Sequence, residues 1–360
     1  MLTLMAAFKH LVVQPPNPQP IRLSSLRRVL PSLMLITGLL SSEVVACSHP
    51  EVQPVDMNTR IADVLASLYK VPLTPHELAC QLGDFAVPVG GHFQGIQQAM
   101  IGSKRFAIIS GSSDSDSYLV LAAIEDSTAR IMSLRRLLHR PFKHAGGFQV
   151  LGDYLAVGIE NNDAKDASKV WILESSQLLR PESPRPIVEI ERRGEFKRAT
   201  AGAVGIARHL GRHVLLVATW DSATIDIYTS NGKSLHDPGF EFRLRETWQA
   251  DAADKSGWAD QHYAAYQNIN LVVDKTDRAF VVAFARTGVE NIADIFELRL
   301  DESVPTAKRF EKLGRRIFHC RRTDFRSGSG VAIDDSGELL ILSCGHREFA
   351  IELFALHATN

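Results

Sequence analysis

The sequence lacks an excess of either charge, because 40 lysine and arginine residues stand against 41 aspartate and glutamate residues, for a formal net charge of −1. Without a basic surplus, general attraction to nucleic acid is excluded as the basis of its function. Cysteine is scarce, with four residues and no Cys-x-x-Cys pair, which excludes a zinc knuckle and a thioredoxin-type redox motif. The hydrophobic content is an ordinary 45%, and it indicates a globular protein rather than a disordered or fibrous one.

The first 47 residues have the pattern of an export signal. Arg27 and Arg28 precede an apolar run from Val29 to Leu40, and small residues lead up to Cys47. This run is shorter than the roughly 20 residues that span a bilayer, whereas a signal peptide needs only about 7–15. We therefore expect residues 1–47 to direct export, to the periplasm or to the outer membrane of a bacterium.

Cys47 itself suggests a lipid anchor. The sequence Val44-Val45-Ala46-Cys47 resembles a bacterial lipobox, in which the cysteine is acylated and anchors the protein to a membrane. Glu43 departs from that pattern, so simple cleavage after Ala46 remains the alternative. Acylation of Cys47 is the prediction.

The three remaining cysteines are an odd number: Cys80, Cys320 and Cys344. Cys344 lies in an apolar run and is expected to be a buried thiol. A disulfide between Cys80 and one of the other two stays open, because an oxidising compartment would allow it.

Residues 48–83 are expected to be a short helical lead-in. Apolar residues at Ile61, Val64, Leu65 and Leu68 follow helical spacing, with Asn58 or Thr59 as the N-cap. A further turn or two of helix is expected from Thr74-Pro75 through Leu82, since proline favours the first position of a helix. After Gly83 the sequence shows no amphipathic helix of normal length.

From residue 84 to residue 360 a pattern recurs about every 50–70 residues. A Gly-rich or polar cluster is followed by a strand, a turn, a strongly apolar strand and then a third strand. The clusters begin at His92, His144, Thr200, Gln267 and Ser327. Four strands per repeat without helices predict an all-β fold, a β-propeller. Five copies favour five blades, with six as the alternative because the third repeat is the longest.

The last copy contains three strands, so the ring needs a fourth from elsewhere in the chain. The segment Asp84–Val89 is the expected donor. The Gly-rich strand starts of residues 84–360 resemble those of secreted bacterial β-propeller proteins, without the signature of any specific functional family. WD40 and kelch signatures and sialidase-type aspartate boxes are absent.

In a propeller, the start of each innermost strand and the end of the strand beside it lie on the same face, because the two strands are antiparallel. This face surrounds the mouth of the central channel, where we expect a site for a small polar ligand. The candidate ligand-binding residues are His92, Gln94, His144, Asn161, Asn270, Arg286 and His346. The same clusters also contain glycines, which are explained by close packing of the inner strands.

Three carboxylates end strands of successive repeats: Asp114, Glu160 and Asp221. Their succession resembles the arrangement in five-bladed glycosidases, in which a carboxylate pair performs acid and base catalysis. His92 and His144 occupy equivalent repeat positions, and such a pair can bind a metal or move protons. Zinc would require a third or fourth ligand, such as His346 or Glu160. The prediction is a site without a metal.

The functional prediction is an exported propeller that binds a small polar ligand, a glycan or a protein at the channel mouth. It is expected to be a monomer, with no cofactor and no nucleic-acid partner. The alternative is a hydrolase of the glycosidase or of the lactonase and esterase type, which would use the carboxylates and histidines of the same face. The sequence leaves open which of the two is correct and which ligand is bound.

Overall fold

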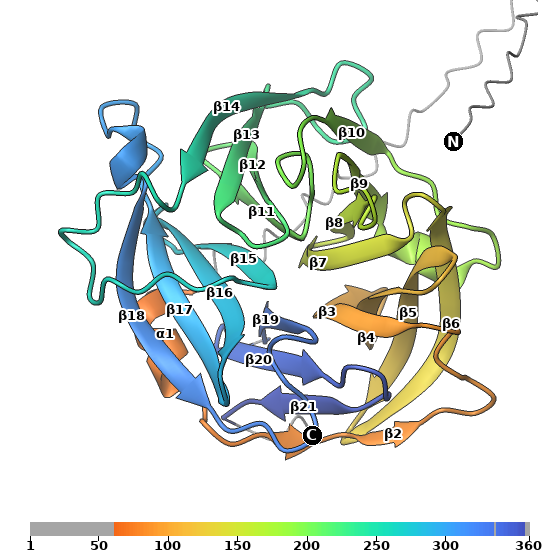
Figure 1. Cartoon of the computed structure of the whole chain (residues 1–360). Helices are drawn as coiled ribbons and strands as arrows, with labels where there is room; N and C mark the ends of the chain where they lie inside the picture. The colour runs from red at the N-terminus through yellow and green to blue at the C-terminus, as the bar shows by residue number, and fades with distance from the viewer. Residues whose placement is uncertain (1–60, 335, 357–360) are drawn as a thin grey trace, which may run out of the picture. The chain divides into compact units, whose positions relative to one another are not determined.

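The computed structural model describes residues 61–334 and 336–356, which form five four-stranded antiparallel sheets (Figure 1). We number these sheets blades 1 to 5, each from its innermost strand outward. Blade 1 comprises β3 (His92–Ile101), β4 (Lys104–Ser112), β5 (Asp116–Glu125) and β6 (Thr128–His139). Blade 2 comprises β7 (His144–Leu151), β8 (Tyr154–Glu160), β9 (Ala167–Glu174) and β10 (Val188–Arg193). Blade 3 comprises β11 (Ala203–His209), β12 (Arg212–Ala218), β13 (Thr224–Ser230) and β14 (Phe242–Gln249). Blade 4 comprises β15 (Asn268–Val273), β16 (Ala279–Thr287), β17 (Glu290–Leu298) and β18 (Phe310–Phe318). Blade 5 comprises β19 (Ser329–Ile333), β20 (Leu339–Cys344), β21 (Ile351–Phe354) and β1 (His76–Glu77).

The blades are arranged in a closed ring. Each of the inner strands β3, β7, β11, β15 and β19 contacts the next, and β19 contacts β3 (Figure 1). Five clusters of buried hydrophobic side chains lie between neighbouring blades, one for each pair around the ring. Because a single sheet cannot bury both of its faces, this packing between blades supplies the core. The predicted β-propeller is thereby confirmed.

The ring is closed by β1, and the prediction that Asp84–Val89 would do so is wrong. His76 pairs with Leu353 of β21, whereas residues 84–89 form no strand. Pro88 lacks the N–H group that a strand needs for its hydrogen bonds. The residues that the structure describes form no sixth blade either, since residues 250–267 of the longest repeat form a loop between β14 and β15.

The predicted second helical turn between Thr74 and Leu82 is also wrong. This segment forms β1 and then β2 (Ala79–Gln81), which runs parallel to β6 of blade 1. Two- and three-residue strands are too short to show a period of two, so the Thr-Pro signal misled the prediction. The segment thus connects blade 5 to blade 1 around the outside of the ring (Figure 1).

The first predicted helix is present as α1 (Val64–Lys70). Its N-cap is Asp63, whose side chain accepts a hydrogen bond from the Ala66 N–H at 2.9 Å, and the expected caps Asn58 and Thr59 lie outside the described residues. Val64 and Leu68 are buried in the cluster between blades 4 and 5. The other helices in the described part of the chain are the short 3-10 helices η2 (Ser175–Leu179) and η3 (Thr306–Lys308). Within residues 61–334 and 336–356, none of the helices is long and apolar enough to cross a membrane.

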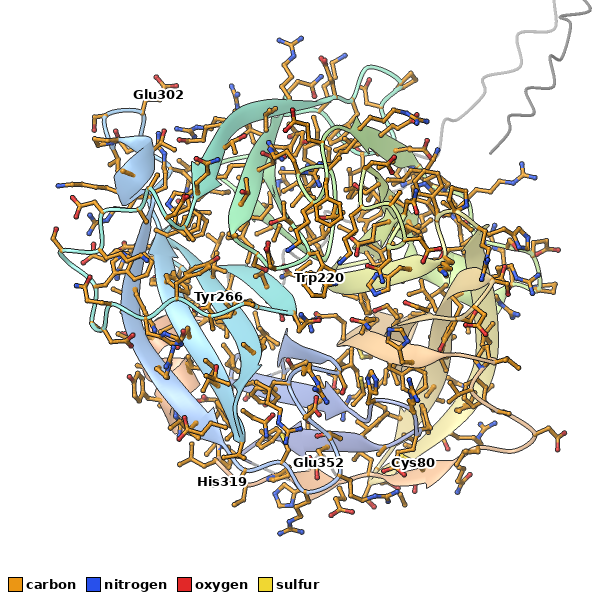
Figure 2. All side chains as sticks on the ribbon, viewed as in Figure 1. Cys80, Trp220, Tyr266, Glu302, His319 and Glu352 are labelled. Carbon is orange, nitrogen blue, oxygen red and sulfur yellow. The ribbon has the colours of Figure 1, made fainter. Side chains whose placement is uncertain are left out.

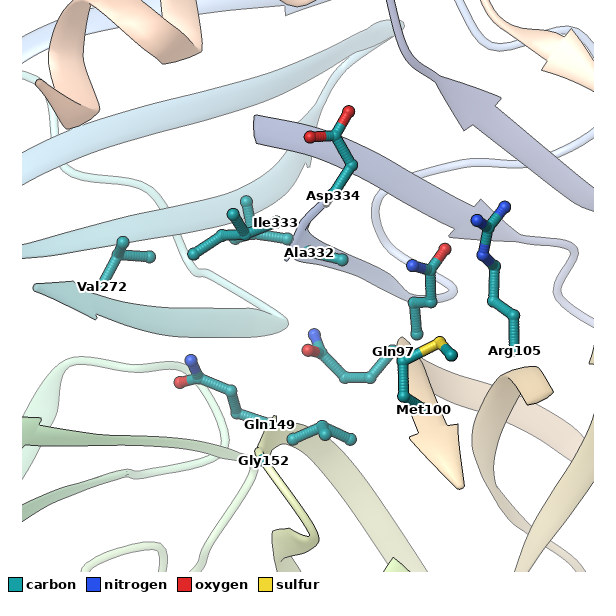
Figure 3. Close-up of a pocket in the computed structure, with 12 residues that line it drawn as sticks. Gln97, Met100, Arg105, Gln149, Gly152, Val272, Ala332, Ile333 and Asp334 are labelled. Atoms are coloured by element: carbon teal, nitrogen blue, oxygen red, sulfur yellow. The ribbon is translucent and has the colours of Figure 1, made fainter. Parts of the chain in front are cut away.

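Amide side chains tie the inner strands together across the axis of the ring. The side-chain oxygen of Gln149 accepts hydrogen bonds from the Ile206 and Leu271 N–H groups, each at 2.8 Å. The side-chain amide of Gln97 donates to Asn270 at 3.1 Å. Gln97 and Gln149 face a small recess of about 60 Å³ at the far ends of the inner strands (Figure 3). The amide side chains therefore fill the centre of the ring at this end of the inner strands. They would close the bottom of any binding site at the opposite end, where the inner strands start.

Candidate functional site

Three histidines from three different segments meet at the face where the inner strands begin. His92 starts β3, His144 starts β7, and His346 follows β20. The His92 ring centroid lies 5.9 Å from that of His144 and 5.2 Å from that of His346. The antiparallel pairing of inner and second strands explains this convergence, as the sequence predicts. The three histidines define what we call the histidine cluster.

Glu160 lies beneath the cluster and is fully buried. Its Oε1 atom is 3.2 Å from Nδ1 of His144, within ion-pair distance but outside the angles of a hydrogen bond. Its Oε2 atom accepts a hydrogen bond from the Ala201 N–H at 2.9 Å. Glu160 is the cross-strand partner of His144, which places the two side chains together. Its carboxylate contacts the buried side of the His144 ring and is not accessible from the open face.

The environment of the cluster favours the uncharged imidazole at His92 and at His346. Burial, together with the neighbouring His144 and His346, which act in the same direction, lowers the pKa of His92 to about 4. Burial also lowers the pKa of His346, with the charges of Arg326 and Arg347 adding to the effect. A neutral imidazole offers one hydrogen-bond donor and one acceptor. The face is therefore suited to hydroxyl groups, which also donate and accept.

The low pKa of His92 predicts a pH-dependent stability. Between the ordinary histidine pKa of about 6.5 and about 4, the unfolded chain takes up a proton at His92 that the folded chain does not. The free energy of unfolding should decrease as the pH falls through this window and level off below it. Urea unfolding at pH 6.5 and pH 4.5 should show a larger loss for the natural protein than for His92→Asn. Equal losses in the two proteins would contradict the assignment.

The other predicted residues differ in exposure and in the contacts that their side chains make. The Asp114 side chain is exposed and that of Gln94 is half-buried. Asp221 accepts hydrogen bonds from the Thr219 hydroxyl at 3.0 Å and the Ala223 N–H at 3.2 Å. The structure thus does not bring Glu160 and Asp221 together as two free carboxylates across a pocket.

Asn161 and Arg286 also make local contacts. The side-chain oxygen of Asn161 accepts from the Ala164 N–H at 3.2 Å, within the loop after β8. The guanidinium of Arg286 donates to Asp324 at 2.9 Å, and about a third of the side chain is exposed, 34%. Part of the Arg286 side chain is therefore accessible to a ligand, whereas the Asn161 side chain stabilises the loop after β8.

Asn270 does not lie at the mouth, so its predicted role in ligand binding does not fit the structure. It is fully buried, and its side-chain oxygen accepts from Gln97 at 3.1 Å and from the Val331 N–H at 2.6 Å. It lies two residues inside β15, where alternate side chains face the axis. Its amide links inner strands, as does that of Gln149.

The glycines of the strand starts are explained by packing, as the sequence indicates. A Cβ atom on Gly146 would lie 2.3 Å from the carbonyl oxygen of Gly202, and one on Gly147 would lie 2.5 Å from that of Gln267. These distances are far shorter than van der Waals contact. The absence of side chains lets blades 2, 3 and 4 approach one another below the histidine cluster.

Trp220 is a residue of this face that the sequence reasoning passed over. It is the second residue after the end of β12, as His346 is the second residue after β20, and Figure 2 shows it towards the centre of the ring. The indole is 38% exposed, and the amino groups of Lys165 and Lys197 lie 4.0 and 5.6 Å from its ring centre. Its backbone N–H donates to the Thr200 hydroxyl at 2.8 Å. The signal for it in the sequence is a tryptophan that comes just after the strongly apolar strand 212–218.

Among residues 61–334 and 336–356, no three His, Cys, Asp or Glu side chains are grouped closely enough to hold a metal ion. Cys80, Cys320 and Cys344 are free thiols, so the open question of a disulfide is answered in the negative for these three. Burial raises the pKa of the Cys320 thiol to about 12, which makes it unreactive at neutral pH. Cys47 and the export segment lie outside the described residues.

The chain is similar to known proteins in its structure but not in its sequence. No family model and no curated protein sequence matches the chain. An exo-β-1,3-galactanase from Clostridium thermocellum matches 78% of this chain and 61% of its own, at 11% identity and a TM-score of 0.45. The exo-β-1,3-galactanase from Phanerochaete chrysosporium with galactose matches 77% and 62%, at 8% identity and a TM-score of 0.44. A glycoside hydrolase candidate from Parabacteroides distasonis matches 81% and 94%, at 9% identity and a TM-score of 0.44. The chain spans about three fifths of the length of the two galactanases that it matches.

Proposed function

We propose that the face with the histidine cluster binds a carbohydrate. The observation that carries this proposal is the combination of three imidazoles, which favour the neutral form at His92 and His346, with the exposed indole of Trp220 on one face. Sugar hydroxyls donate and accept hydrogen bonds, as neutral imidazoles do. An indole adds a rigid apolar surface with a polar edge. Few polar groups around an aromatic anchor are typical of small-ligand sites.

Trp220 and the histidine cluster are linked through the backbone of blades 2 and 3. The Trp220 N–H binds the Thr200 hydroxyl, and the next residue, Ala201, donates its N–H to Glu160 beneath His144. One short segment therefore positions the aromatic side chain and the buried carboxylate. This connection supports a single site rather than two unrelated features.

A second candidate function is hydrolysis of a bound ester or glycoside. The observation that favours it is the buried pair of Glu160 and His144, because a carboxylate beside an imidazole can orient it as a general base. In this function His144 would take the proton from an attacking water, while Glu160 would stabilise the resulting imidazolium. The carboxylate pair of Glu160 and Asp221 is not part of the proposal, since the structure engages both groups elsewhere.

The proposal is tested by a binding screen of the purified protein against an array of neutral and acidic oligosaccharides. We expect defined oligosaccharides to bind, and we expect His346→Asn to weaken the same hits. Product analysis of the hits by mass spectrometry separates binding from hydrolysis. Turnover that is lost in Glu160→Gln and His144→Asn would assign the second function, whereas an array without any hit would contradict both.

We also propose that the protein acts after export, and the apolar run and lipobox-like sequence before Cys47 support this. Mass spectrometry of the protein from the producing cell tests the proposal. A mature chain that begins at an acylated Cys47 is expected, and an intact Met1 would overturn it.

A further inference from the structure

A recess of about 580 Å³ opens beside the histidine cluster, between blades 4 and 5. Three chain segments line it: the turn between β16 and β17, the loop that follows β18, and the loop that follows β20. His346 belongs to both the recess and the histidine cluster, since its ring lies 5.2 Å from that of His92. The recess and the histidine cluster are therefore adjacent, with His346 as their shared residue.

The lining of the recess is predominantly cationic. It contains four arginines and two carboxylates: Arg286, Arg321, Arg322, Arg347, Asp324 and Glu348. The carboxylates are engaged, because Asp324 pairs with Arg286 at 2.9 Å and Glu348 pairs with Arg322 at 3.5 Å. Arg347 forms no ion pair within the described part of the chain. Arg321 also pairs with Glu77, outside the recess, at 3.8 Å. The side chains that line the recess therefore carry a net charge of +2, in a concave and partly shielded position.

The backbone that carries these arginines is fixed by the core. Glu352 of β21 is fully buried, and its Oε1 atom accepts hydrogen bonds from the N–H groups of Arg321 and Arg322 at 2.8 and 2.9 Å. Its other oxygen binds the Thr323 hydroxyl at 2.5 Å. Figure 2 shows Glu352 within blade 5. The buried carboxylate of Glu352 therefore fixes the backbone of Arg321 and Arg322, and a binding site requires such fixed positions.

We propose that this recess binds the acidic group, a carboxylate or a sulfate, of a saccharide whose neutral part lies at the histidine cluster. The inference rests on the proposed function and specifies its ligand class as acidic oligosaccharides. Arginine matches this chemistry, because its planar guanidinium pairs two N–H groups with two oxygens of an oxyanion. In this proposal the histidines bind the hydroxyl groups of the saccharide, and the arginines of the recess bind its acidic group.

The test uses saccharide pairs that differ only in charge. One pair is a mannuronate tetrasaccharide and its methyl ester, and the other is 3′-O-sulfated lactose and lactose. Isothermal titration with the full-length mature protein should give at least about ten-fold tighter binding of the charged member, for the carboxylate or for the sulfate pair, with a preference that decreases from 50 to 200 mM salt. The pair that shows the preference distinguishes the two acidic groups.

Two variants test whether the preference for the charged saccharide depends on the recess. Arg321→Gln combined with Arg347→Gln should remove the preference for the charged saccharide and leave the affinity for the neutral one unchanged. Arg243→Gln is the matched control, because this arginine is exposed on β14, outside the recess. It should retain the preference.

Three results would overturn the inference, and they are distinguishable. Equal affinity for the charged and neutral members refutes the acidic recess and leaves the carbohydrate site in place. Absence of binding to every oligosaccharide, neutral or charged, removes the proposed function as well. Arginine-dependent binding to vesicles of anionic phospholipid, without binding to saccharides, would assign the recess to a membrane surface instead.

Discussion

Replacing Gly146 with alanine should lower the free energy of unfolding by about 3 kcal/mol or more. The added Cβ atom would lie 2.3 Å from the carbonyl oxygen of Gly202 and 3.1 Å from that of Ala201. Both neighbours are backbone atoms in the adjoining blade, so no side-chain rotation can make room. The carbonyl of Gly146 also accepts a hydrogen bond from the Ser110 hydroxyl at 2.7 Å, which further restricts its movement. Urea unfolding of the two proteins measures the change.

Gly194→Ala is the matched control for this experiment. Its Cβ atom would meet only the side chain of Ala199, at the ordinary contact distance of 3.6 Å. We expect a change within about 0.5 kcal/mol. Similar stabilities for Gly146→Ala and the natural protein would show that the inner strands are not packed as closely as described.

Replacing Asp294 with alanine should cost about 3–5 kcal/mol, because it would remove the fully buried one of the two carboxylates that pair with a buried ammonium group. Asp294 and Lys312 are fully buried in blade 4, and the Lys312 Nζ lies 2.9 Å from Oδ2 of Asp294. Arg315 binds both oxygens of the same carboxylate, at 2.7 and 2.8 Å, and the Tyr266 hydroxyl donates to it at 2.5 Å. Arg315 and Tyr266 would lose this acceptor at once, and Lys312 would keep only Asp260 and the carbonyl oxygen of His262 as partners. Chemical unfolding at neutral pH again gives the magnitude.

Glu297→Ala on the same strand provides the comparison for Asp294. Glu297 pairs with Arg278 at 3.0 Å, but its side chain is accessible to water. Loss of an exposed ion pair costs about 0–1 kcal/mol. A loss for Asp294→Ala as small as that for Glu297→Ala would mean that water or Asp260, which is 2.8 Å from Lys312, compensates for the missing carboxylate.

The sequence allowed the propeller and its functional face to be predicted because both follow from the repeat. The strand starts at His92 and His144 recur at one repeat position, and antiparallel pairing then brings them near His346. The short strand β1 was missed for a physical reason: two residues contain no periodicity, and only their pairing with β21 identifies them as a strand.

The direction in which each polar side chain points could not be predicted. The seven residues of β8 are nearly all buried on both faces, so the sequence pattern does not separate an inward from an outward Glu160. Asn270 is similar, since a polar residue in a buried inner strand either faces a ligand or links two strands. Only the positions of Gln97 and Val331 show that Asn270 links strands.

The most direct test of the central claim, that the histidine face is a carbohydrate site, is a titration of the best oligosaccharide from the array into the natural protein and into Trp220→Ala. Loss of the indole should weaken binding by about ten-fold or more, as expected when an aromatic anchor is removed. Tyr69→Ala is the control, because Tyr69 is an exposed aromatic residue on α1 that also packs against a basic side chain, that of Arg316. Unchanged binding by Tyr69→Ala together with weakened binding by Trp220→Ala is the predicted result. Equal affinities for the natural protein and Trp220→Ala would contradict the account.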